Sequence, residues 1–302
     1  MYNRMLVPLD GSELAEVVFP YARELAGRLG LELIFLHVCV PEESHLFRMH
    51  QAYAERVLEI TKSQVQQRAH PEKKEVKGRG EVVIGHPAEE ILRYADEKDV
   101  DLILIATHGR SGVKRWTMGS VADKVLRSSK APVWLVRAGV PEEIVYDKWP
   151  SRTILVPLDG SELAESVLPH VETIAKQRGA ELLDVVLVRV CERPYISGDY
   201  PFPDWEEHVE RVMTWFRKES EQYLAGIEKR LKAAGLKVKS EVLMGKPSDE
   251  IIGCVSKNPF NLIVMATHGR TGLTRWAYGS VADRVLHGAS SPLLLIRPGE
   301  NT

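Results

Sequence analysis

The chain has 302 residues, with 40 Lys and Arg against 42 Asp and Glu and a net charge of −2. This balance lacks the basic excess typical of proteins that bind nucleic acid, and the longest apolar runs are too short to cross a membrane. The cysteines Cys39, Cys191 and Cys254 show no metal-ligand spacing, and an expected strand directly after Met1 leaves no room for a signal peptide. We therefore expect a cytoplasmic globular protein.

In the first half of the chain, short apolar runs alternate with amphipathic stretches. The pattern predicts strands over 5–9, 33–40, 81–84, 101–106 and 132–137, and helices over 12–29, 48–68, 87–97 and 120–128. Most of these strands are near-continuous apolar runs, which is typical of strands that helices cover on both faces. The sequence therefore predicts an α/β fold of doubly wound, parallel, Rossmann-like sheets.

The second half of the chain repeats the first. Residues 5–16 recur almost unchanged at 154–165, and residues 102–126 recur with few changes at 262–286. The period is the length of a whole domain, so we expect a first domain over 1–140, a linker over 141–152 and a second domain over 153–302. The second copy adds a Pro- and aromatic-rich insert at 194–205. Each copy is expected to form its own five-stranded sheet and its own site.

The repeated segment after the fourth strand has the parts of a phosphate-binding loop. It lies at the carboxyl end of a strand, where open parallel sheets bind ligands. Its glycines let the backbone approach an anion, its helix start favours negative charge, and arginines lie nearby. In the first copy these residues are Gly109, Arg110, Gly112, Gly119, Ser120 and Val121; in the second they are Gly269, Arg270, Gly272, Gly279, Ser280 and Val281.

The repeated segment after the first strand is a poorer phosphate site. It contains Pro8 and Asp10 in the first copy, and Pro157 and Asp159 in the second. Two glutamates follow in the first turn of the next helix of each copy, where they would repel an anion. We therefore assign the two aspartates to the nucleoside end of a ligand or to a metal.

Structural alternatives exist for the same residues. Ser120 with Asp123, and the matching pair in the second copy, resemble a capping box, which would make this helix start purely structural. His108 and His268 invite a catalytic interpretation, but no Ser, Cys or second His accompanies both of them. A structural role is therefore favoured for the two histidines.

With these motifs the chain resembles the universal stress protein family, whose ATP-binding branch has the motif G-x2-G-x9-G-[S/T]. Residues 106–120 and 266–280 fit the motif, except that Ala106 and Ala266 stand at its first glycine. The resemblance covers nearly the whole chain. It implies five strands in the order 3-2-1-4-5 in each copy, with phosphates held at the two Gly-Ser helix starts.

The resemblance also implies ligand contacts and a mode of assembly. Asp10 and Asp159 would contact the nucleoside, and Val38 and Val190 would lie near the adenine of ATP, ADP or AMP, which Mg²⁺ could accompany. The resemblance further implies dimerisation through the fifth strand. We expect the fifth strands of the two copies to pair within this chain about a pseudo-twofold axis, with Trp134 buried beside the contact.

These observations favour an ATP-binding, stress-response regulatory protein with no enzymatic activity beyond slow ATP hydrolysis. The alternative is a nucleotide-free interaction protein that retains the fold for dimerisation. Assembly into a homo-oligomer is open, and neither nucleic acid nor a membrane is an expected partner.

Overall fold

The computed structural model describes residues 2–67, 76–108, 118–137, 152–178, 183–192, 205–257, 262–267 and 278–297. Strands and helices alternate along each half, as the sequence predicts. The first half contains β1 (Arg4–Leu9), α1 (Glu13–Glu16), α2 (Phe19–Leu29), β2 (Glu32–Cys39), the 3-10 helix η1 (Pro41–Leu46), α3 (Phe47–Gln67), β3 (Gly78–Ile84), α4 (Pro87–Glu97), β4 (Leu102–Ala106), α5 (Ser120–Ser128) and β5 (Val133–Val136).

The second half follows the same order of elements. It contains β6 (Arg152–Pro157), α6 (Glu162–Glu165), α7 (Leu168–Arg178), β7 (Leu183–Cys191), α8 (Trp205–Ala233), β8 (Lys237–Met244), α9 (Pro247–Lys257), β9 (Leu262–Ala266), α10 (Ser280–Gly288) and β10 (Leu293–Ile296). Its α8, with 29 residues, is longer than the 21-residue α3 that occupies the same place in the first half.

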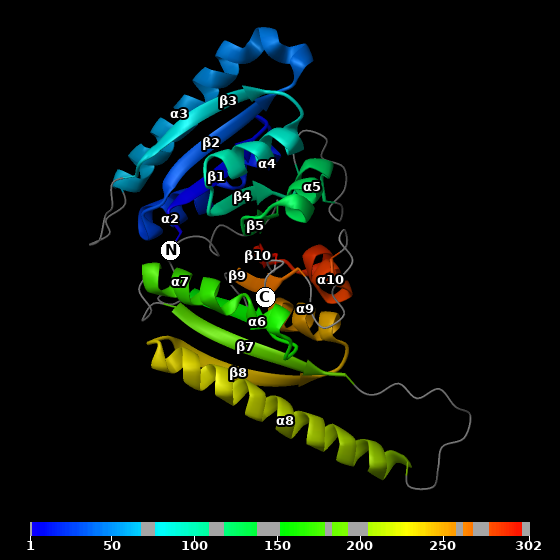
Figure 1. The fold of residues 1–302 in the computed structure, drawn as a ribbon. Coiled ribbons are helices and arrows are strands. Elements are labelled where there is room, and N and C mark those ends of the chain that lie inside the picture. Colours follow the sequence, from blue (N-terminus) through cyan, green and yellow to red (C-terminus); the bar gives the residue numbers. More distant parts are fainter. Residues whose placement is uncertain are drawn as a thin grey trace.

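The strands form one sheet in the order β3-β2-β1-β4-β5-β10-β9-β6-β7-β8 (Figure 1). Each half has the predicted order 3-2-1-4-5, and within each half all the strand pairs are parallel. The expectation of two separate five-stranded sheets is corrected, because β5 and β10 join the halves into a single ten-stranded sheet. The unpaired edge that a fifth strand would expose is thereby removed in both halves.

The stretch predicted as one helix over 12–29 is two helices, α1 and α2. Pro20 occupies the first turn of α2, where its missing N–H costs nothing. In a continuous helix its ring would clash with the carbonyl of Glu16, so the chain turns at Val17 and Val18 and begins a new helix. Pro169 repeats this break between α6 and α7.

Helices cover both faces of the sheet. Successive residues of β2 point to opposite sides, so that Phe35 packs in one apolar layer and Ile34 in the other. The first layer also takes side chains of α2, α3, α7 and α8, and the second takes those of α4, α5, α9 and α10. Both layers run across the two halves, so the joint between the halves lies within the hydrophobic core.

At that joint, β5 and β10 pair in antiparallel fashion, with Trp134 opposite Leu294. Trp134 is only 6% exposed, as predicted. The carbonyls of Pro132 and Val136 accept hydrogen bonds from the β4 side. Val133 and Leu135 lie between them in the alternating pattern, so their N–H groups face β10.

Further contacts reinforce the joint on both sides of the strand pair. Arg137 Nη1 donates to the carbonyl of His287, and Arg297 Nη1 donates to the carbonyl of Arg127, at 2.9 and 3.0 Å. The Tyr278 hydroxyl donates to Asp123 Oδ1 at 3.2 Å, and the Arg127 guanidinium lies over the Tyr278 ring. These contacts tie α5 to the residues that flank α10 and β10, and α10 to the residue after β5.

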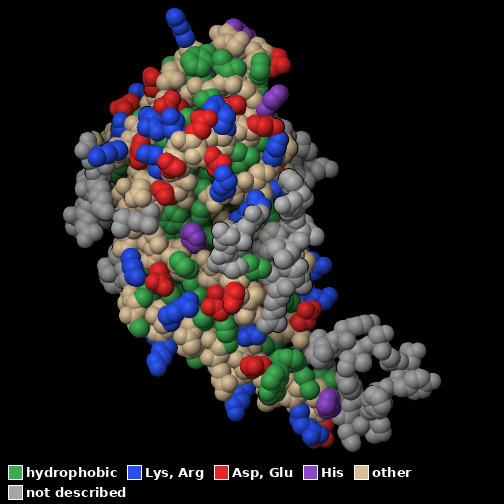
Figure 2. All heavy atoms as spheres, in the orientation of Figure 1, with side chains coloured by type: hydrophobic (Ala, Val, Ile, Leu, Met, Phe, Trp, Pro, Cys, Tyr) green, Lys and Arg blue, Asp and Glu red, His purple; other side chains and the backbone are tan. Residues whose placement is uncertain are grey.

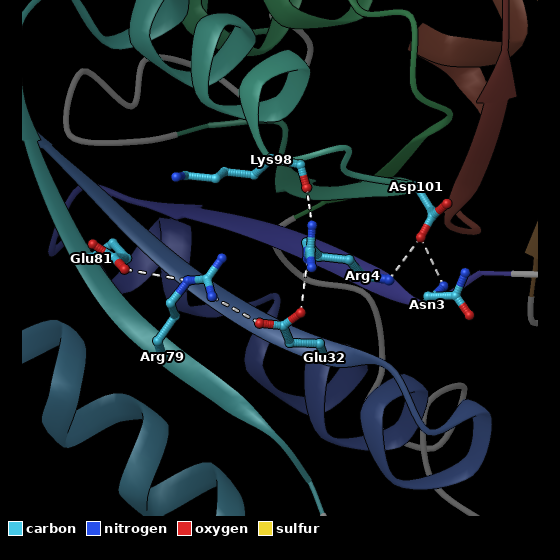
Figure 3. A network of polar contacts seen from close by, with 7 residues as sticks. All are labelled: Asn3, Arg4, Glu32, Arg79, Glu81, Lys98 and Asp101. Atoms are coloured by element: carbon cyan, nitrogen blue, oxygen red, sulfur yellow. Dashed lines mark hydrogen bonds and ion pairs between the residues drawn. The ribbon is translucent and has the colours of Figure 1, made fainter.

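The amino ends of the first-half strands carry a network of charged side chains (Figure 3). Glu32 bridges Arg4, at 2.8 Å, and Arg79, at 3.0 Å, and Arg79 also pairs with Glu81. Asp101 Oδ2 accepts the backbone N–H groups of Asn3 and Arg4, each at 2.9 Å. Exposed ion pairs contribute little stability each, but together they fix how these strands begin. The network lies at the amino ends of these strands and does not occupy their carboxyl ends, where a ligand site is expected.

The visible surface of the protein is mixed in charge. Acidic and basic side chains are interspersed over the face shown in Figure 2, so this face has no large patch of one sign. Within the described ranges, no helix combines the length and the apolar character that a membrane crossing needs.

Candidate functional site

A cavity of about 270 Å³ opens at the carboxyl ends of β1, β2 and β4 in the first half. Every predicted site residue of this copy that the structure describes lines it: Pro8, Asp10, Val38, Ala106, Gly119, Ser120 and Val121. Segments more than 100 residues apart in the sequence therefore meet at one place. Gly109, Arg110 and Gly112 lie outside the described residues.

The second half has a larger cavity, of about 780 Å³, in the corresponding position. It is lined by Pro157, Asp159, Val190, Ala266, Gly279, Ser280 and Val281, which are the matching site residues of the second copy. Gly269, Arg270 and Gly272 lie outside the described part of the chain. The two cavities are called pocket 1 and pocket 2 below.

The helix α5 begins at pocket 1 without a side-chain cap. Gly119 is the N-cap residue and Ser120 is already the first helical residue, so the capping box considered for Ser120 and Asp123 is wrong. Asp123 instead pairs with Arg127, at 2.8 Å, and accepts the Tyr278 hydroxyl. α10 begins in the same way at Gly279. The first N–H groups of both helices are therefore available to an anion.

Gly119 stands where space is tight. Its φ of −65° is accessible to any residue, but a Cβ there would lie 3.3 Å from the carbonyl oxygen of Thr107. The same carbonyl accepts the Gly119 N–H at 2.8 Å, which ties the start of α5 to the end of β4. A larger residue would therefore fill the gap between the helix start and the strand end.

The helices that follow β1 and β6 begin differently. The Ser12 side chain caps α1 by accepting the Ala15 N–H, and Asp10 Oδ1 accepts both the N–H and the hydroxyl of Ser12. Ser161 and Asp159 make the same contacts at α6. A capped helix start behind a carboxylate disfavours a phosphate. The geometry thus separates an anion end at α5 or α10 from a carboxylate end at Asp10 or Asp159.

The wall of pocket 1 contains His37, which belongs to a pair of histidines that the sequence analysis did not identify. His37, at the end of β2, stacks on His50 of α3 with the ring centroids 3.9 Å apart, and both are buried. Tyr53 packs edge-on against His37, and its hydroxyl donates to Glu16 Oε1 at 2.9 Å. Burial, and then this hydrogen bond, raise the pKa of Tyr53, which therefore remains a proton donor at neutral pH.

The wall of pocket 2 is built from different side chains on the same scaffold. Tyr223 of α8 donates to Glu165 Oε1 at 2.9 Å, as Tyr53 does to Glu16, and burial again raises the tyrosine pKa. Arg189 stands in the place of His37, with its guanidinium carbon 4.8 Å from the centroid of the Tyr223 ring. Ser220 stands in the place of His50 and lies 3.2 Å from Cys191 Sγ.

The difference between the two pocket walls can be recognised by aligning the sequences of the two copies. The strands β2 and β7 both end in Val-Cys, and the residue before that pair is His37 in one copy and Arg189 in the other. Changes beside a repeated motif mark where two similar sites differ.

His108 lies beside pocket 1, with Nδ1 3.0 Å from the Thr107 hydroxyl. His268, its counterpart, lies outside the described residues, as do Trp116 and Trp276. Among the described side chains, no group of three or more His, Cys, Asp or Glu residues is arranged to hold a metal ion.

Comparisons with known proteins agree with this architecture. The model of the universal stress protein family matches residues 1–137 and 150–297. A universal stress protein of Methanocaldococcus jannaschii is 33% identical over 146 residues, which are 48% of this chain and 82% of that protein. A universal stress protein of Bacillus subtilis is 33% identical over 152 residues, covering 45% of this chain and all of that protein.

Solved structures match both halves of the chain at once. The crystal structure of a universal stress protein from Archaeoglobus fulgidus aligns with 99% of this chain and 100% of its own, with a TM-score of 0.68 and 22% sequence identity. At this level of identity the likeness concerns the fold, including the succession of two similar halves.

Proposed function

The chain belongs to the universal stress protein family, and we propose that it is a stress-response regulatory protein that binds an adenine nucleotide, ATP foremost, in each of its two pockets. One observation carries the proposal. Each pocket has a helix start without a side-chain cap at one end and an Asp beside an apolar wall at the other. This polarity matches a nucleotide, which is anionic at one end and aromatic at the other.

In pocket 1, the phosphates would lie against the N–H groups that follow Gly119, where the helix dipole and the short distance favour negative charge. Val38 and the apolar end of β4 would contact the faces of the adenine. Asp10 would accept a hydrogen bond from the nucleoside, since a carboxylate accepts and cannot donate. Gly279, Val190 and Asp159 would do the same in pocket 2.

A magnesium ion could enter with the nucleotide. The phosphate oxygens and water would supply most of its ligands, because Mg²⁺ retains several waters and needs few protein oxygens. Asp10 and Glu43 are the carboxylates among the residues that line pocket 1, and Ser12 already donates twice to Asp10 Oδ1.

We infer that the bound nucleotide is a signal and is hydrolysed slowly at most. Fast phosphoryl transfer needs an oriented water and a residue to position it. Asp123, the carboxylate nearest to Gly119 in α5, is held by Arg127 and Tyr278 and faces the joint between the halves. Binding without rapid turnover suits a protein that reports nucleotide levels.

The proposal is tested by mass spectrometry of the nucleotide released on denaturing the purified protein, and by calorimetric titration with ATP. Gly119→Val should block pocket 1 and Gly279→Val pocket 2, so the stoichiometry falls from two to one in each variant and to zero in the double variant. Gly226→Val is the matched control, because a Cβ at that position of α8 meets nothing within 4 Å.

If the folded double variant still binds ATP with the affinity of the wild type, the phosphate assignment is wrong. If the wild type binds and retains no nucleotide, the alternative of a nucleotide-free interaction protein replaces it.

A further inference from the structure

Arg189 is a cation held in the wall of pocket 2. It is half-buried at the carboxyl end of β7, directly before Val190. Its guanidinium carbon lies 4.8 Å from the centroid of the Tyr223 ring, so the cation rests over an aromatic face. The guanidinium also passes close to Gly160, because a Cβ at that residue would lie 3.3 Å from its carbon and its two terminal nitrogens. Gly160 has a φ of +87°, a conformation that favours glycine, and this leaves room for the arginine.

The contacts of Arg189 hold its side chain without occupying its hydrogen-bond donors. An arginine carries five N–H donors and no acceptor. Among the described residues, Arg189 makes no hydrogen bond, and Glu192 and Glu219, which also line the pocket, form no ion pair with it. A contact with an aromatic ring engages the face of the guanidinium, whereas the N–H groups point outward from its edge. The donors are therefore available to a ligand in pocket 2.

The position of Arg189 places it at the base end of the pocket. Gly160, which it passes, directly follows Asp159, and the next residue along β7 is Val190. Both Asp159 and Val190 belong to the end proposed for the nucleoside, whereas the proposed phosphates lie at Gly279. The adenine base, rather than a phosphate, is therefore the group that Arg189 would meet.

The edge of adenine around its amino group suits a carboxylate and an arginine placed together. The amino group donates hydrogen bonds, and the ring nitrogens N1 and N7, which flank it, accept them. A carboxylate only accepts and a guanidinium only donates. Asp159 would accept from the amino group while Arg189 donates to the ring nitrogen on one side of it. A hydrogen bond from a charged donor is stronger than one from a neutral donor, so this contact should contribute measurably to affinity.

Pocket 1 has no guanidinium at the same position. His37 stands there, only 1% exposed and covered on one face by His50. A neutral histidine has one N–H donor, and its ring does not reach as far as an arginine side chain. The base end of pocket 1 therefore offers the Asp10 carboxylate without a permanently charged donor. The two pockets would bind the same base through different atoms.

We propose that Arg189 is a base-recognition residue of pocket 2, which donates a hydrogen bond to a ring nitrogen of adenine, N1 or N7, beside the amino group that Asp159 binds. The proposal rests on the proposed binding of an adenine nucleotide in both pockets. It makes the affinity of pocket 2 depend on that ring nitrogen as well as on the amino group and the phosphates. Pocket 1 depends on it less, because His37 takes the place of the arginine.

The test measures pocket 2 alone, in full-length protein that carries Gly119→Val. Calorimetric titration compares ATP with 1-deaza-ATP and 7-deaza-ATP, in each of which a C–H group replaces one ring nitrogen and the amino group is retained. One of the two analogues should bind about tenfold or more weakly than ATP, because it loses a hydrogen bond from a charged donor. The matched control ligand is 3-deaza-ATP, which is altered away from the amino group and should bind about as well as ATP.

Arg189→Met removes the donors and keeps much of the side-chain length. In this variant, ATP should bind as weakly as the sensitive analogue does, and the analogue should lose little further affinity. An arginine that only stabilises the fold, or only attracts the phosphates, would lower the affinity for ATP and for its analogues by the same factor. Arg189→His, which introduces the residue of pocket 1, gives the same comparison if the methionine variant does not fold. In protein that carries Gly279→Val, pocket 1 should lose less affinity with the same analogue.

Three results would overturn the inference and leave the proposed function standing. They are equal affinities of pocket 2 for ATP, 1-deaza-ATP and 7-deaza-ATP, an equal loss of ATP and analogue binding on substitution of Arg189, and an analogue penalty as large in pocket 1 as in pocket 2. Failure of every nucleotide to bind pocket 2, with a wild-type stoichiometry of one, would overturn the proposed function of that pocket and the inference with it.

Discussion

Pocket 1 and pocket 2 share the same floor and differ in one wall. The floor is made by the ends of β1 and β4, or β6 and β9, and by the uncapped helix start, and its residues are nearly identical. The wall comes from β2 and α3, or β7 and α8, where a pair of histidines is replaced by Arg189 and Ser220. In the proposed function, the shared part meets the phosphates that every nucleotide has, and the differing part meets the base. Duplication thus allows one recognition element to vary while the other is retained.

The largest expected effect comes from separating the two pockets. Leu135→Pro removes an N–H that faces β10 and inserts a ring into the strand pair, so a ladder hydrogen bond between the halves is lost. We expect the halves to part without unfolding, so that small-angle scattering shows a larger radius of gyration and each pocket can be titrated without its neighbour.

Leu135→Ala is the matched control, since it removes the buried side chain but keeps the N–H. Equal compactness of the proline and alanine variants would show that the strand pair does not hold the halves together. Loss of all folded structure in the proline variant would show that neither half is stable without the joint.

A smaller effect is expected from acid, because the two halves differ at the joint. α7 carries His170 where α2 carries Tyr21, and Nδ1 of His170 lies 2.7 Å from the Tyr2 hydroxyl of the other half. Burial lowers the pKa of His170 below its usual 6.5. As the pH falls below 6.5, His170 in the unfolded chain takes up a proton, whereas in the folded protein it resists protonation. Its contribution to the free energy of unfolding is therefore complete at neutral pH and is lost as the pH falls.

We expect the melting temperature to fall by about 1–3 °C between about pH 7.5 and about pH 5.5 through this residue. His170→Gln keeps an acceptor for Tyr2 but does not titrate, so its melting temperature should decline less over the same range. Parallel declines in the wild type and the variant would remove His170 from the explanation.

The smallest effect concerns salt. Lys114 in the phosphate loop of pocket 1 is replaced by Thr274 in pocket 2, and both lie outside the described residues. The repeated loop of the first copy thus carries one cation more than that of the second, and salt screens the attraction between such a charge and a phosphate. The affinity of pocket 1 should therefore decline more steeply with salt, by about two- to fivefold between low and high ionic strength. Titration of the two single-pocket variants at several salt concentrations measures both slopes, and equal slopes would refute the expectation.

Much of this architecture could be predicted because the chain repeats itself. The apolar strands and the glycine at the end of α2 predict the order of elements, and Gly30, with φ of +70°, ends that helix as expected. The pairing of β5 with β10 could be predicted because each of these strands is apolar and would otherwise form an exposed sheet edge. The apolar character of a strand is visible in its own residues.

The wall of each pocket could not be predicted in the same way. The contact of His37 with His50, and that of Arg189 with Tyr223, each join a strand end to a helix whose offset from it differs between the copies. The spacing of apolar residues predicts which face of a helix packs against the sheet. It does not predict which turn of the helix lies next to the end of a strand. The capping-box interpretation of Ser120 failed for a related reason, because a shift of one residue decides whether a side chain caps a helix or lies within it.

The strand pair β5–β10 also has a consequence for stoichiometry. Two separate, similar chains that pair through an edge strand dissociate on dilution. They also form homodimers as readily as heterodimers. Here the partner strand is tethered, at an effective concentration of about millimolar. The joint is therefore independent of how much protein is present. Within each chain, one pocket with His37 in its wall is always accompanied by one pocket with Arg189 in its wall. This unequal pair is therefore fixed by the gene and cannot be altered by exchange of subunits.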